Sequence, residues 1–351
     1  VIGPGWAGAA AAWQLHKHGH HAIVFEAAHQ AGGRARSYYS KNLATNIDNG
    51  QHILLGAYKA TLSLMQELGL DLDRCFYRFD LDIYSADQSF RFKTAPLPAP
   101  FHLLGPLLSA KGLSFQDKLA LVRLHYSLQR QGWKTQPGLT VLQLLQQTKQ
   151  PALLIQKLWH PLCIAALNTP IETACAQLFA NVLHDSLGGS RAATQMLIPL
   201  NTMTDLWVTT ALKNAETHYG HVVRQITKTS IGYEIDGHAL DAVIVATNSP
   251  SCHKILQNLD KDKQNLSFVE SMLHLSFNPI ATLYLRPTHA WNNPYPMLML
   301  DEDMNSLAAG QWVFNHPALP GSTLGHTIAV TISYANRLAG ASKEQITAAI
   351  I

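Results

Sequence analysis

Charged residues are scarce in this chain, and no segment concentrates them. Lysine, arginine, aspartate and glutamate together make up 14% of the 351 residues, and the formal net charge is only +3. A protein that binds nucleic acid gathers cations along one face or segment, so the sequence argues against nucleic acid as a partner. The mild excess of cations is compatible with anionic lipid or an acidic substrate, but it argues for neither.

Cysteine and long hydrophobic runs are also scarce. The four cysteines contain no C-x-x-C pair, which is typical of reduced thiols in the cytoplasm. No secretory signal is visible, and no uninterrupted apolar stretch reaches the roughly 18 residues of a spanning helix. The sequence therefore predicts a cytoplasmic protein that is not integral to a membrane. The cysteines are Cys75, Cys163, Cys175 and Cys252.

Familiar hydrolase and metal motifs are missing as well. The sequence has no G-x-S-x-G, no H-E-x-x-H and no cysteine pair at metal spacing. Its densest histidine cluster spans a helix end and a turn, and a metal site is not the favoured interpretation there. We expect no bound metal. The clustered histidines are His16, His18, His20 and His21.

What the chain does have is a glycine-rich beginning. Residues 1–8, VIGPGWAG, are typical of a buried strand that runs into a G-x-G-x-x-G turn. Gly3 permits the tight turn, Gly5 lets backbone N–H groups approach a pyrophosphate, and Gly8 lets the next helix pack closely on the strand. That helix, expected over residues 9–15, points its dipole at the anion. The predicted cofactor-binding residues of the turn are Gly3, Gly5, Trp6, Ala7 and Gly8.

Two downstream features support a dinucleotide site. Residues 21–25 form a strand-like apolar run closed by Glu26, whose carboxylate is expected to accept hydrogen bonds from a ribose. Gly32 and Gly33 then bring backbone close a second time, and Arg34 places positive charge beside the pyrophosphate. The alternative is that these glycines only shape turns, but the signals occur in the strand–turn–helix–strand order that the site requires.

Together these motifs resemble the FAD-binding start of the amine oxidase and phytoene desaturase flavoprotein superfamily. The resemblance implies FAD as the cofactor and an α/β fold, in which a Rossmann-type FAD-binding domain carries an inserted, mixed α+β substrate domain. The expected ranges are 1–75 for the first part of the FAD-binding domain, 76–200 for a mainly helical substrate domain, 201–255 for the return of the FAD-binding domain, and 256–351 for the substrate-domain sheet and the start of a final helix.

A polar loop at residues 46–52, NIDNGQH, is a candidate for the flavin-facing side of the site. Together with Gly-Ala-Tyr at 56–58, its DNGQH segment resembles the hydroxysqualene dehydroxylases, which are squalene-associated FAD-dependent desaturases. The alternative is an ordinary Asn-Gly turn with a satisfied histidine. A helix is expected from Leu54 to Met65. The predicted cofactor contacts of the loop are Gly50, Gln51 and His52.

A second point of resemblance is residues 158–170, LWHPLCIAALNTP. A tryptophan-containing apolar helix that ends in Asn-Thr-Pro, followed by a helix over 174–183, also resembles the dehydroxylases. By this comparison Trp159 and Asn168 are candidate substrate-pocket residues. The alternative is a pair of core helices.

The remaining patterns indicate further elements. A hairpin is expected within 76–92, and helices over 114–131 and 140–150, the first with a capping box at Ser114 and Asp117. Strands are expected over 220–226, 233–235 and 241–247, and the last resembles the strand that passes beneath the flavin in the superfamily. Strands over 279–285, 311–314 and 326–333 resemble the sheet that covers the substrate cavity. By the same comparison the predicted cofactor contacts are Thr217, which stands where the family usually has valine, Val223, Ala246 and Thr247.

The ends of the sequence predict a fragment. Val1 falls in mid-strand, and residues 342–350 form a helical pattern without a C-cap signal. Superfamily members complete the FAD site with a glycine- and acid-containing motif near the C-terminus, and nothing after Tyr334 matches it.

An apolar, proline-broken stretch at residues 97–108 cannot be one regular helix. It is either a packed connection or a surface that meets lipid. If the stretch meets lipid, and if the substrate is the water-insoluble isoprenoid that the resemblance implies, we expect peripheral association with the inner face of the cell membrane.

The resemblance extends from Val1 to about Tyr334 and implies reduction of hydroxysqualene to squalene in squalene and hopanoid biosynthesis. Loss of the allylic hydroxyl requires a proton donor and a pocket that excludes water, and His52 is the candidate donor. The resemblance does not name the electron donor to the flavin. Two alternatives are a carotenoid desaturase of the phytoene type or an amine oxidase, and a non-catalytic homologue that binds isoprenoid or membrane.

Overall fold

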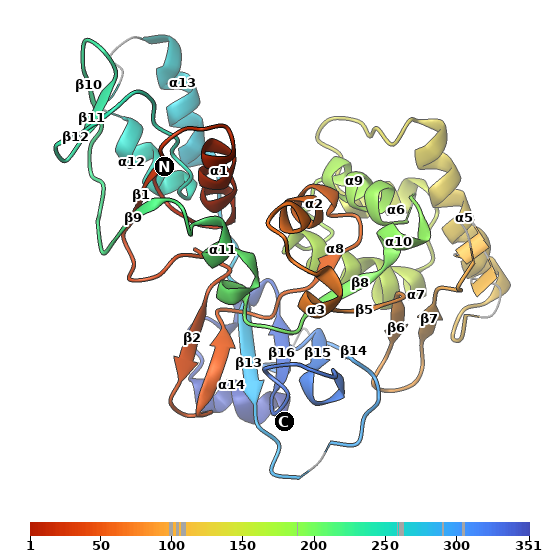
Figure 1. The fold of residues 1–351 in the computed structure, drawn as a ribbon. Coiled ribbons are helices and arrows are strands. Elements are labelled where there is room, and N and C mark those ends of the chain that lie inside the picture. Colours follow the sequence, from red (N-terminus) through yellow and green to blue (C-terminus); the bar gives the residue numbers. More distant parts are fainter. Residues whose placement is uncertain are drawn as a thin grey trace. The chain divides into compact units, whose positions relative to one another are not determined.

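The computed structural model describes residues 1–97, 101–102, 105–106, 110–187, 189–257, 259, 263–289, 291–303 and 306–351. The chain forms two compact units, each assembled from three separate segments (Figure 1). Unit 1 comprises Val1–Asn49, Ser63–Cys75 and Asn201–Phe277, and unit 2 comprises Gly50–Leu62, Phe76–Leu200 and Asn278–Ile351. The assignment of the FAD-binding and substrate roles to the four expected ranges stays a prediction.

The first residues of the chain form the centre of a parallel sheet in unit 1. Ile2 bridges Phe25 and Val245, both in parallel orientation. The Ile2 N–H donates to the Ile244 carbonyl at 2.8 Å, and the Gly3 N–H donates to the Phe25 carbonyl at 2.9 Å. Ile2 is 4% exposed, so the strand that leads into the glycine turn is anchored in the core.

The expected strand–helix–strand order at the start of unit 1 is confirmed for the helix and the second strand, whereas in the first strand only Ile2 forms bridges. Helix α1 (Trp6–Lys17) begins directly after the turn and is longer than the predicted 9–15. It leads to β1 (Ile23–Glu26), which pairs in parallel with β9 (Glu216–Tyr219). Gly19, at φ +80°, follows the end of α1, as expected for a residue that stops a helix.

Two strand predictions in unit 1 need correction. No strand covers 220–226, because Gly220, at φ +67°, turns the chain away after β9. Val223 and Ile226 pack instead in a hydrophobic cluster with Ile2 and Phe25. In the range 241–247 only Val245 forms a bridge. The other elements are β2 (Ser37–Ser40), β3 (Thr45–Asp48), α3 (Leu72–Cys75), η2 (Thr204–Val208), α11 (Thr209–Ala211), β10 (Thr227–Lys228), β11 (Tyr233–Ile235), β12 (His238–Leu240), α12 (Ser249–Leu256), α13 (Lys263–Ser271) and η3 (Met272–His274).

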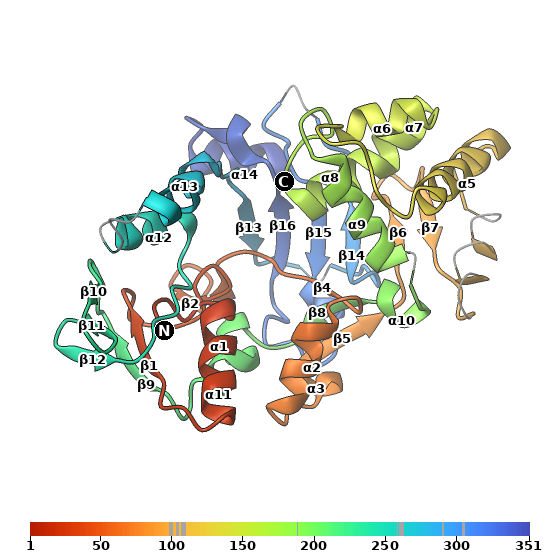
Figure 2. The same ribbon diagram turned by 90° about the horizontal axis from the view of Figure 1, so that it is seen from above.

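An antiparallel sheet forms one part of unit 2 (Figure 2). Its strand order is β13 (Ala281–Leu285), β16 (Ile328–Ile332), β15 (Trp312–Asn315) and β14 (Met297–Met299). The three strands predicted for the C-terminal region are confirmed and belong to this one sheet. The helix predicted over 342–350 is confirmed as α14 (Lys343–Ile350).

The helix predicted from Leu54 to Met65 begins later than expected, because its first residues belong to a second, smaller sheet. Leu54–Leu55 form strand β4, and helix α2 (Lys59–Glu67) begins only afterwards. Strand β4 pairs with β8 (Met196–Pro199), a partner far along the chain, and this pairing overrides the local helical spacing. The hairpin prediction is confirmed in part: β6 (Asp82–Tyr84) pairs with β7 (Arg91–Lys93), whereas β5 (Phe76–Phe79) joins β8.

The helices of unit 2 within residues 115–187 share one hydrophobic core, whereas α14 packs in a separate cluster. Helix α5 (Phe115–Arg130) begins at the predicted capping box of Ser114 and Asp117, and α6 (Val141–Gln147) begins at a second one, of Thr140 and Gln143. Their buried faces pack with Phe179 and neighbouring side chains. The other elements are α7 (Ala152–Leu154), η1 (Ile155–Trp159), α8 (His160–Leu167), α9 (Ala176–Leu187), α10 (Arg191–Thr194), η4 (His316–Ala318) and η5 (Ala335–Leu338). No helix in the described ranges has both the length and the apolar character to cross a membrane.

Asp48, in the predicted polar loop, ties two parts of unit 1 together. It is 4% exposed, and its Oδ1 accepts hydrogen bonds from the Ser37 hydroxyl at 2.6 Å and the Met203 N–H at 2.8 Å. The Ser37 N–H donates to the Thr204 hydroxyl, and the Thr204 N–H donates to the Ser37 hydroxyl. The β2–β3 hairpin is thereby fastened to the start of η2.

We expect Asp48→Ala to lower the free energy of unfolding by about 2–4 kcal/mol, because it leaves a buried N–H and a buried hydroxyl without their acceptor. Urea unfolding followed by circular dichroism measures the change. Asp241→Ala, which removes an exposed carboxylate from the same unit, is the matched control and should change little. Equal stability of the two variants would contradict the role assigned to Asp48.

Candidate functional site

The glycine turn of unit 1 is built by close contact between backbones. Gly3 has φ +86°, in the left-handed region that favours glycine. A Cβ added at Gly8 would lie 2.1 Å from the Gly3 carbonyl oxygen, so the first turn of α1 packs directly on the turn that precedes it. These two positions therefore require glycine for reasons of conformation and space.

The second glycine pair meets the first turn. Gly32 forms a parallel bridge with Gly5, and its N–H donates to the Pro4 carbonyl at 2.9 Å. A Cβ added at Gly33 would lie 3.1 Å from the Gly5 Cα. The two glycine motifs that the sequence singled out thus form one surface of bare backbone.

Gly5 differs from Gly3, Gly8 and Gly33 because a Cβ added there would make only an ordinary van der Waals contact. The nearest atom to an added Cβ is the Gly33 Cα at 3.9 Å, and Gly5 has φ −67°, which any residue adopts. Gly5 is also the N-cap of α1, and no side chain caps that end. Uncapped N–H groups at a helix N-terminus bind phosphate through hydrogen bonds and the helix dipole.

The residues around this cradle fit a pyrophosphate. Arg34 is exposed, and its guanidinium has no ion-pair partner among the residues that the structure describes. It is therefore available to a phosphate. The Trp6 ring packs edge-on against Trp207 at 5.2 Å between centroids, and the contacts of Trp6 and Ala7 with the cofactor stay predictions. The observed geometry supports the predicted FAD site without testing individual contacts.

The far end of the predicted site lies along β1 and β9. Glu26 is the last residue of β1, and its Oε1 accepts a hydrogen bond from the Ala28 N–H at 2.7 Å. Thr217 lies beside Val24 in the register of the two strands. Val223 is 8% exposed in the hydrophobic cluster of unit 1. The roles of Glu26 at a ribose and of Thr217 and Val223 as cofactor contacts stay predictions.

Ala246 and Thr247 lie against the glycine turn, and their contact with the cofactor stays a prediction. The Ala246 N–H donates to the Ile2 carbonyl at 2.9 Å, and its Cβ lies 3.3 Å from a Cβ added at Gly8. The Thr247 methyl lies 3.1 Å from a Cβ added at Gly3. Residues more than 200 positions apart in the chain therefore meet at one turn of unit 1.

The predicted contacts Gly50, Gln51 and His52 belong to unit 2. A Cβ added at Gly50 would lie 3.6 Å from the hydroxyl oxygen of Thr282, which belongs to β13. The Gln51 N–H donates to the same hydroxyl at 3.3 Å, and the Gln51 Nε2 donates to the His52 carbonyl at 3.0 Å. The loop is thus fastened to the edge of the four-stranded sheet.

His316 also contacts the loop of Gly50, Gln51 and His52, and the sequence analysis did not identify it. It is 1% exposed, and burial lowers its pKa to about 4, so the imidazole is neutral near pH 7. Its Nε2 lies 2.8 Å from the Gln51 Oε1. Because the Gln51 Nε2 donates to His52, its Oε1 is the acceptor, which assigns the proton of His316 to Nε2.

The two candidate pocket residues have structural partners. The Trp159 indole is 5% exposed, donates to the Gln150 Oε1 at 3.0 Å and packs in the helical core. Asn168 ends α8 at φ 49°, donates from Nδ2 to the Asn278 carbonyl at 2.7 Å and accepts from the Tyr334 N–H at 2.6 Å. Their contact with a substrate stays a prediction.

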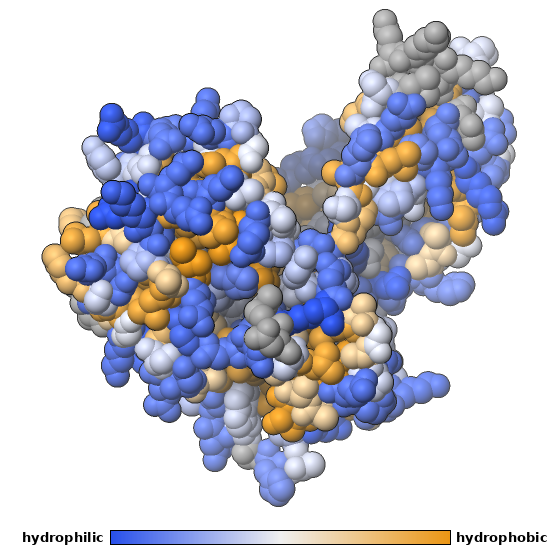
Figure 3. All heavy atoms as spheres, turned by 180° about the vertical axis from the view of Figure 1, so that it is seen from behind, coloured by the Kyte–Doolittle hydropathy of each residue, from blue (hydrophilic) through white to orange (hydrophobic). Residues whose placement is uncertain are grey.

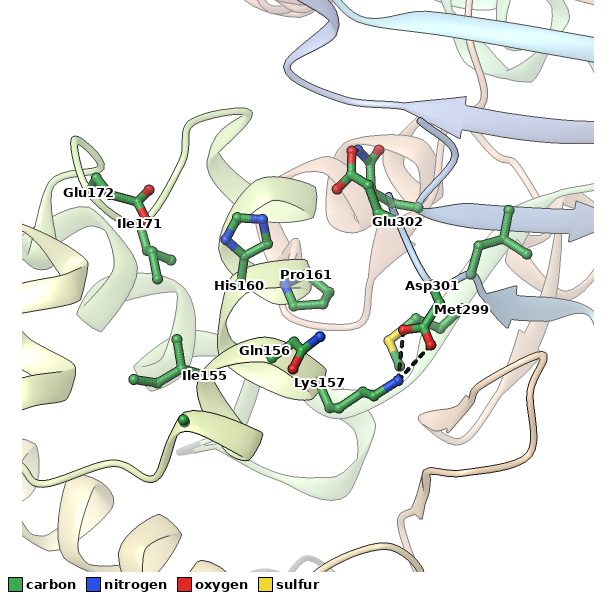
Figure 4. Close-up of a pocket in the computed structure, with 13 residues that line it drawn as sticks. Ile155, Gln156, Lys157, His160, Pro161, Ile171, Glu172, Met299, Asp301 and Glu302 are labelled. Atoms are coloured by element: carbon green, nitrogen blue, oxygen red, sulfur yellow. Dashed lines mark hydrogen bonds and ion pairs between the residues drawn. The ribbon is translucent and has the colours of Figure 1, made fainter. Parts of the chain in front are cut away.

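Unit 2 contains a pocket of about 350 Å³ between η1 with α8 and the ends of β14 and β15 (Figure 4). Lys157 bonds both carboxylate oxygens of Asp301 at 2.7 Å on one side. Burial raises the pKa of Glu302 and lowers that of His160. A π-helical turn such as η1 often marks a functional site, and this irregularity has no signal in the sequence. The lining residues are Ala152, Ile155, Gln156, Lys157, His160, Pro161, Ile171, Glu172, Met299, Leu300, Asp301, Glu302 and Gln311.

Within the described part of the chain, no three histidine, cysteine, aspartate or glutamate side chains are grouped to hold a metal ion. The histidines near the end of α1 make other contacts. His16 Nε2 lies 2.9 Å from the Asn214 Nδ2, and His18 Nδ1 lies 2.8 Å from the Gln14 carbonyl.

We expect Gly5→Val and Gly8→Ala to fail in different ways. A Cβ at Gly5 makes only an ordinary contact with the Gly33 Cα, so Gly5→Val should abolish flavin absorbance while changing the unfolding temperature of the apoprotein little. Gly8→Ala forces the turn open, because its Cβ would lie 2.1 Å from the Gly3 oxygen, and should lower that temperature as well. Purified Gly5→Val protein with an unchanged flavin content would refute the cradle.

The sequence is similar to known flavoproteins over almost its full length. The family model for flavin containing amine oxidoreductases matches residues 6–351. A hydroxysqualene dehydroxylase from Zymomonas mobilis is 26% identical over an alignment of 367 positions, gaps included, that covers 99% of this chain and 78% of the relative. One from Rhodopseudomonas palustris is also 26% identical, over 100% of this chain and 79% of the relative.

The fold is likewise known from solved structures. An oxidoreductase from Methanosarcina mazei superposes with a TM-score of 0.68 at 15% identity, covering 99% of this chain and 80% of that one. The cradle of bare backbone at the start of α1 is where a dinucleotide fits in such a fold. The chain belongs to the family of flavin-containing amine oxidoreductases, with FAD as its cofactor.

Proposed function

We propose that the protein catalyses the FAD-dependent reductive dehydroxylation of hydroxysqualene to squalene. The observation that carries this proposal is the similarity, over 99–100% of this chain and 78–79% of each relative, to three proteins that bear the name hydroxysqualene dehydroxylase. The fit of the glycine cradle to a pyrophosphate supports the cofactor half of the proposal.

The reaction replaces a C–O bond by a C–H bond. The hydroxyl takes up a proton and leaves as water, and a hydride is added to the carbon. Reduced FAD, when bound, supplies hydride chemistry of this kind. The chain itself must hold the isoprenoid, deliver the proton at the hydroxyl oxygen and keep water from the electron-deficient carbon.

His52 is the proposed proton donor. Its backbone is held by Gln51, and Gln51 is held by Thr282 and by the neutral imidazole of His316. A side chain that delivers a proton needs such a fixed position, because small displacements slow proton transfer strongly. His316 and Thr282 are accordingly positioning residues in this proposal.

The pocket beside η1 is proposed to receive part of the isoprenoid. Ile155, Pro161, Ile171 and Met299 give it apolar walls, and His160 and Glu172 add polar groups to its lining. Its volume of about 350 Å³ is at the lower end of the range for small-molecule sites, so it suits a segment of a C30 chain rather than the whole molecule.

A peripheral position on the inner face of the cell membrane also belongs to this proposal, since hydroxysqualene and squalene are insoluble in water. The predicted lipid contact at 97–108 lies partly outside the described residues, at 98–100, 103–104 and 107–108. Its described members Leu97 and Phe101 are 44% and 60% exposed. The electron donor to the flavin is left open.

Product analysis tests the proposed activity. We expect the reduced full-length enzyme, incubated with hydroxysqualene under anaerobic conditions, to form squalene in an amount limited by its flavin. Oxidised enzyme is the control and should form none. A desaturated isoprenoid, or no product from protein that retains its flavin, would contradict the proposal.

We expect His52→Gln to lower kcat by about 10²–10⁴-fold, the range for loss of a general acid, with flavin absorbance retained. His326→Gln, which alters an exposed histidine of the same unit, is the matched control. A pH profile of kcat that keeps its shape and height in His52→Gln would assign the proton to another group.

A further inference from the structure

Helix α5 is apolar on two opposite faces. Its inner face is buried, with Ala120, Leu124 and Leu128 at 2%, 1% and 0% exposure in the helical core. Both ribbon views place α5 at the periphery of unit 2 (Figures 1 and 2). A peripheral helix of a globular protein normally has one apolar face and one polar face.

The outer face of α5 carries a regular hydrophobic stripe. Phe115, Leu119, Val122 and Tyr126 are 71%, 48%, 44% and 63% exposed. Their spacing of four, three and four residues places them within an arc of about 60° on an α-helix. This stripe lies on the side of the helix opposite Leu124.

The exposure alone is not distinctive. On the face drawn in Figure 3, hydrophobic residues reach the surface as separate patches bordered by polar ones. Scattered exposed apolar residues of this kind are normal and need no ligand. What distinguishes α5 is the regular spacing of its stripe together with the charge around it.

The segment around α5 is strongly cationic. Residues 111–134 contain five cations and one acid, a net charge of +4, whereas the whole chain carries +3. The acid, Asp117, is 6% exposed and accepts hydrogen bonds from the backbone and side chain of Ser114. The exposed charges of the segment are therefore all positive. The cations are Lys111, Lys118, Arg123, Arg130 and Lys134.

Helical geometry brings these cations beside the stripe, although the sequence has no basic run. At about 100° per residue, Lys118 lies on one side of the stripe, and Arg123 and Arg130 lie on the other. Neither Arg123 nor Arg130 is in an ion pair within the ranges that the structure describes. Their long side chains can hold charge at headgroup level while the stripe enters the interface.

We propose that this face of α5, formed by Phe115, Leu119, Val122 and Tyr126 with the flanking cations, docks on an anionic lipid bilayer. A few partly inserted apolar side chains together with basic residues give reversible binding in the plane of the membrane. A second copy of the chain is a poorer occupant, because self-pairing would set cations against cations. Binding of α5 to the bilayer is argued independently of the proposed function. Only the purpose of this binding, to draw a water-insoluble isoprenoid from the bilayer, rests on it.

Cosedimentation of the full-length protein with vesicles tests the surface. We expect binding to vesicles that contain phosphatidylglycerol, and weaker binding to pure phosphatidylcholine. Arg123→Glu with Arg130→Glu should lower the partition coefficient on the anionic vesicles by at least about tenfold, since each basic residue near the membrane surface strengthens binding to anionic lipid. Phe115→Ser with Leu119→Ser should lower it by about tenfold or more on both kinds of vesicle.

Matched variants separate this surface from general effects. Lys213→Glu with Lys228→Glu changes the net charge equally at exposed positions of unit 1, and Ile231→Ser removes a 90% exposed apolar side chain there. These controls should bind like the wild type. Flavin absorbance and the unfolding temperature report whether each variant keeps its fold.

A direct measurement covers the case in which the α5 variants unfold. Cys175 is the exposed one of the four cysteines, so Cys175→Ser provides a background with buried thiols only. An environment-sensitive fluorophore on Val122→Cys should shift to shorter wavelength when anionic vesicles are added. The same label on Ile231→Cys should not shift.

Three outcomes would overturn the proposal. They are a wild-type protein that does not sediment with anionic vesicles, α5 variants that bind as well as the wild type, and a wild-type dimer that dissociates in the α5 variants, which would make this face a subunit interface. None of these measurements depends on turnover. Failure of the surface is therefore distinguishable from failure of the proposed activity.

Discussion

The structure of unit 1 depends on the close approach of bare backbone at one turn. The carbonyl of Gly3 occupies the space that a side chain at Gly8 would need, and the Gly5 Cα would crowd a side chain at Gly33. Ile2, one residue earlier, forms parallel bridges with Phe25 on one side and Val245 on the other. The phosphate cradle is therefore a continuation of the central strand of the core, and its geometry is fixed by the same interactions that stabilise the fold.

Elements with local signals were predictable from the sequence. The capping boxes at Ser114 and Ser342 mark the starts of α5 and α14, because a side chain and a backbone group three residues apart satisfy one another. Elements that depend on distant partners were not predictable. Leu54 and Leu55 have helical spacing but pair with β8, and the range 220–226 has strand-like composition but follows a glycine in a left-handed conformation. Composition does not encode which strand will be available to pair.

The candidate site divides in the same way. The glycine motifs were predictable because each is complete within a few residues. The close approach of backbone that they permit is visible in the sequence as glycine. The contact between His316 and Gln51 joins positions 265 residues apart, so no local pattern shows it. The two-sided character of α5 is intermediate. Its periodicity is visible in the sequence, but only the packing of Leu124 and Leu128 shows which of its apolar faces is left exposed.

The buried state of His316 has a consequence for how the protein responds to pH. Burial lowers its pKa in the folded state to about 4, whereas an exposed histidine titrates near about 6.5. Between these values the unfolded chain binds a proton that the folded chain does not, so the stability from the neutral imidazole is complete above the higher value and is lost as the pH falls through the lower one. The hydrogen bond that fastens Gln51 is therefore constant around neutral pH. A change in activity in that range must come from another group, which makes the pH profile informative about the proton donor itself.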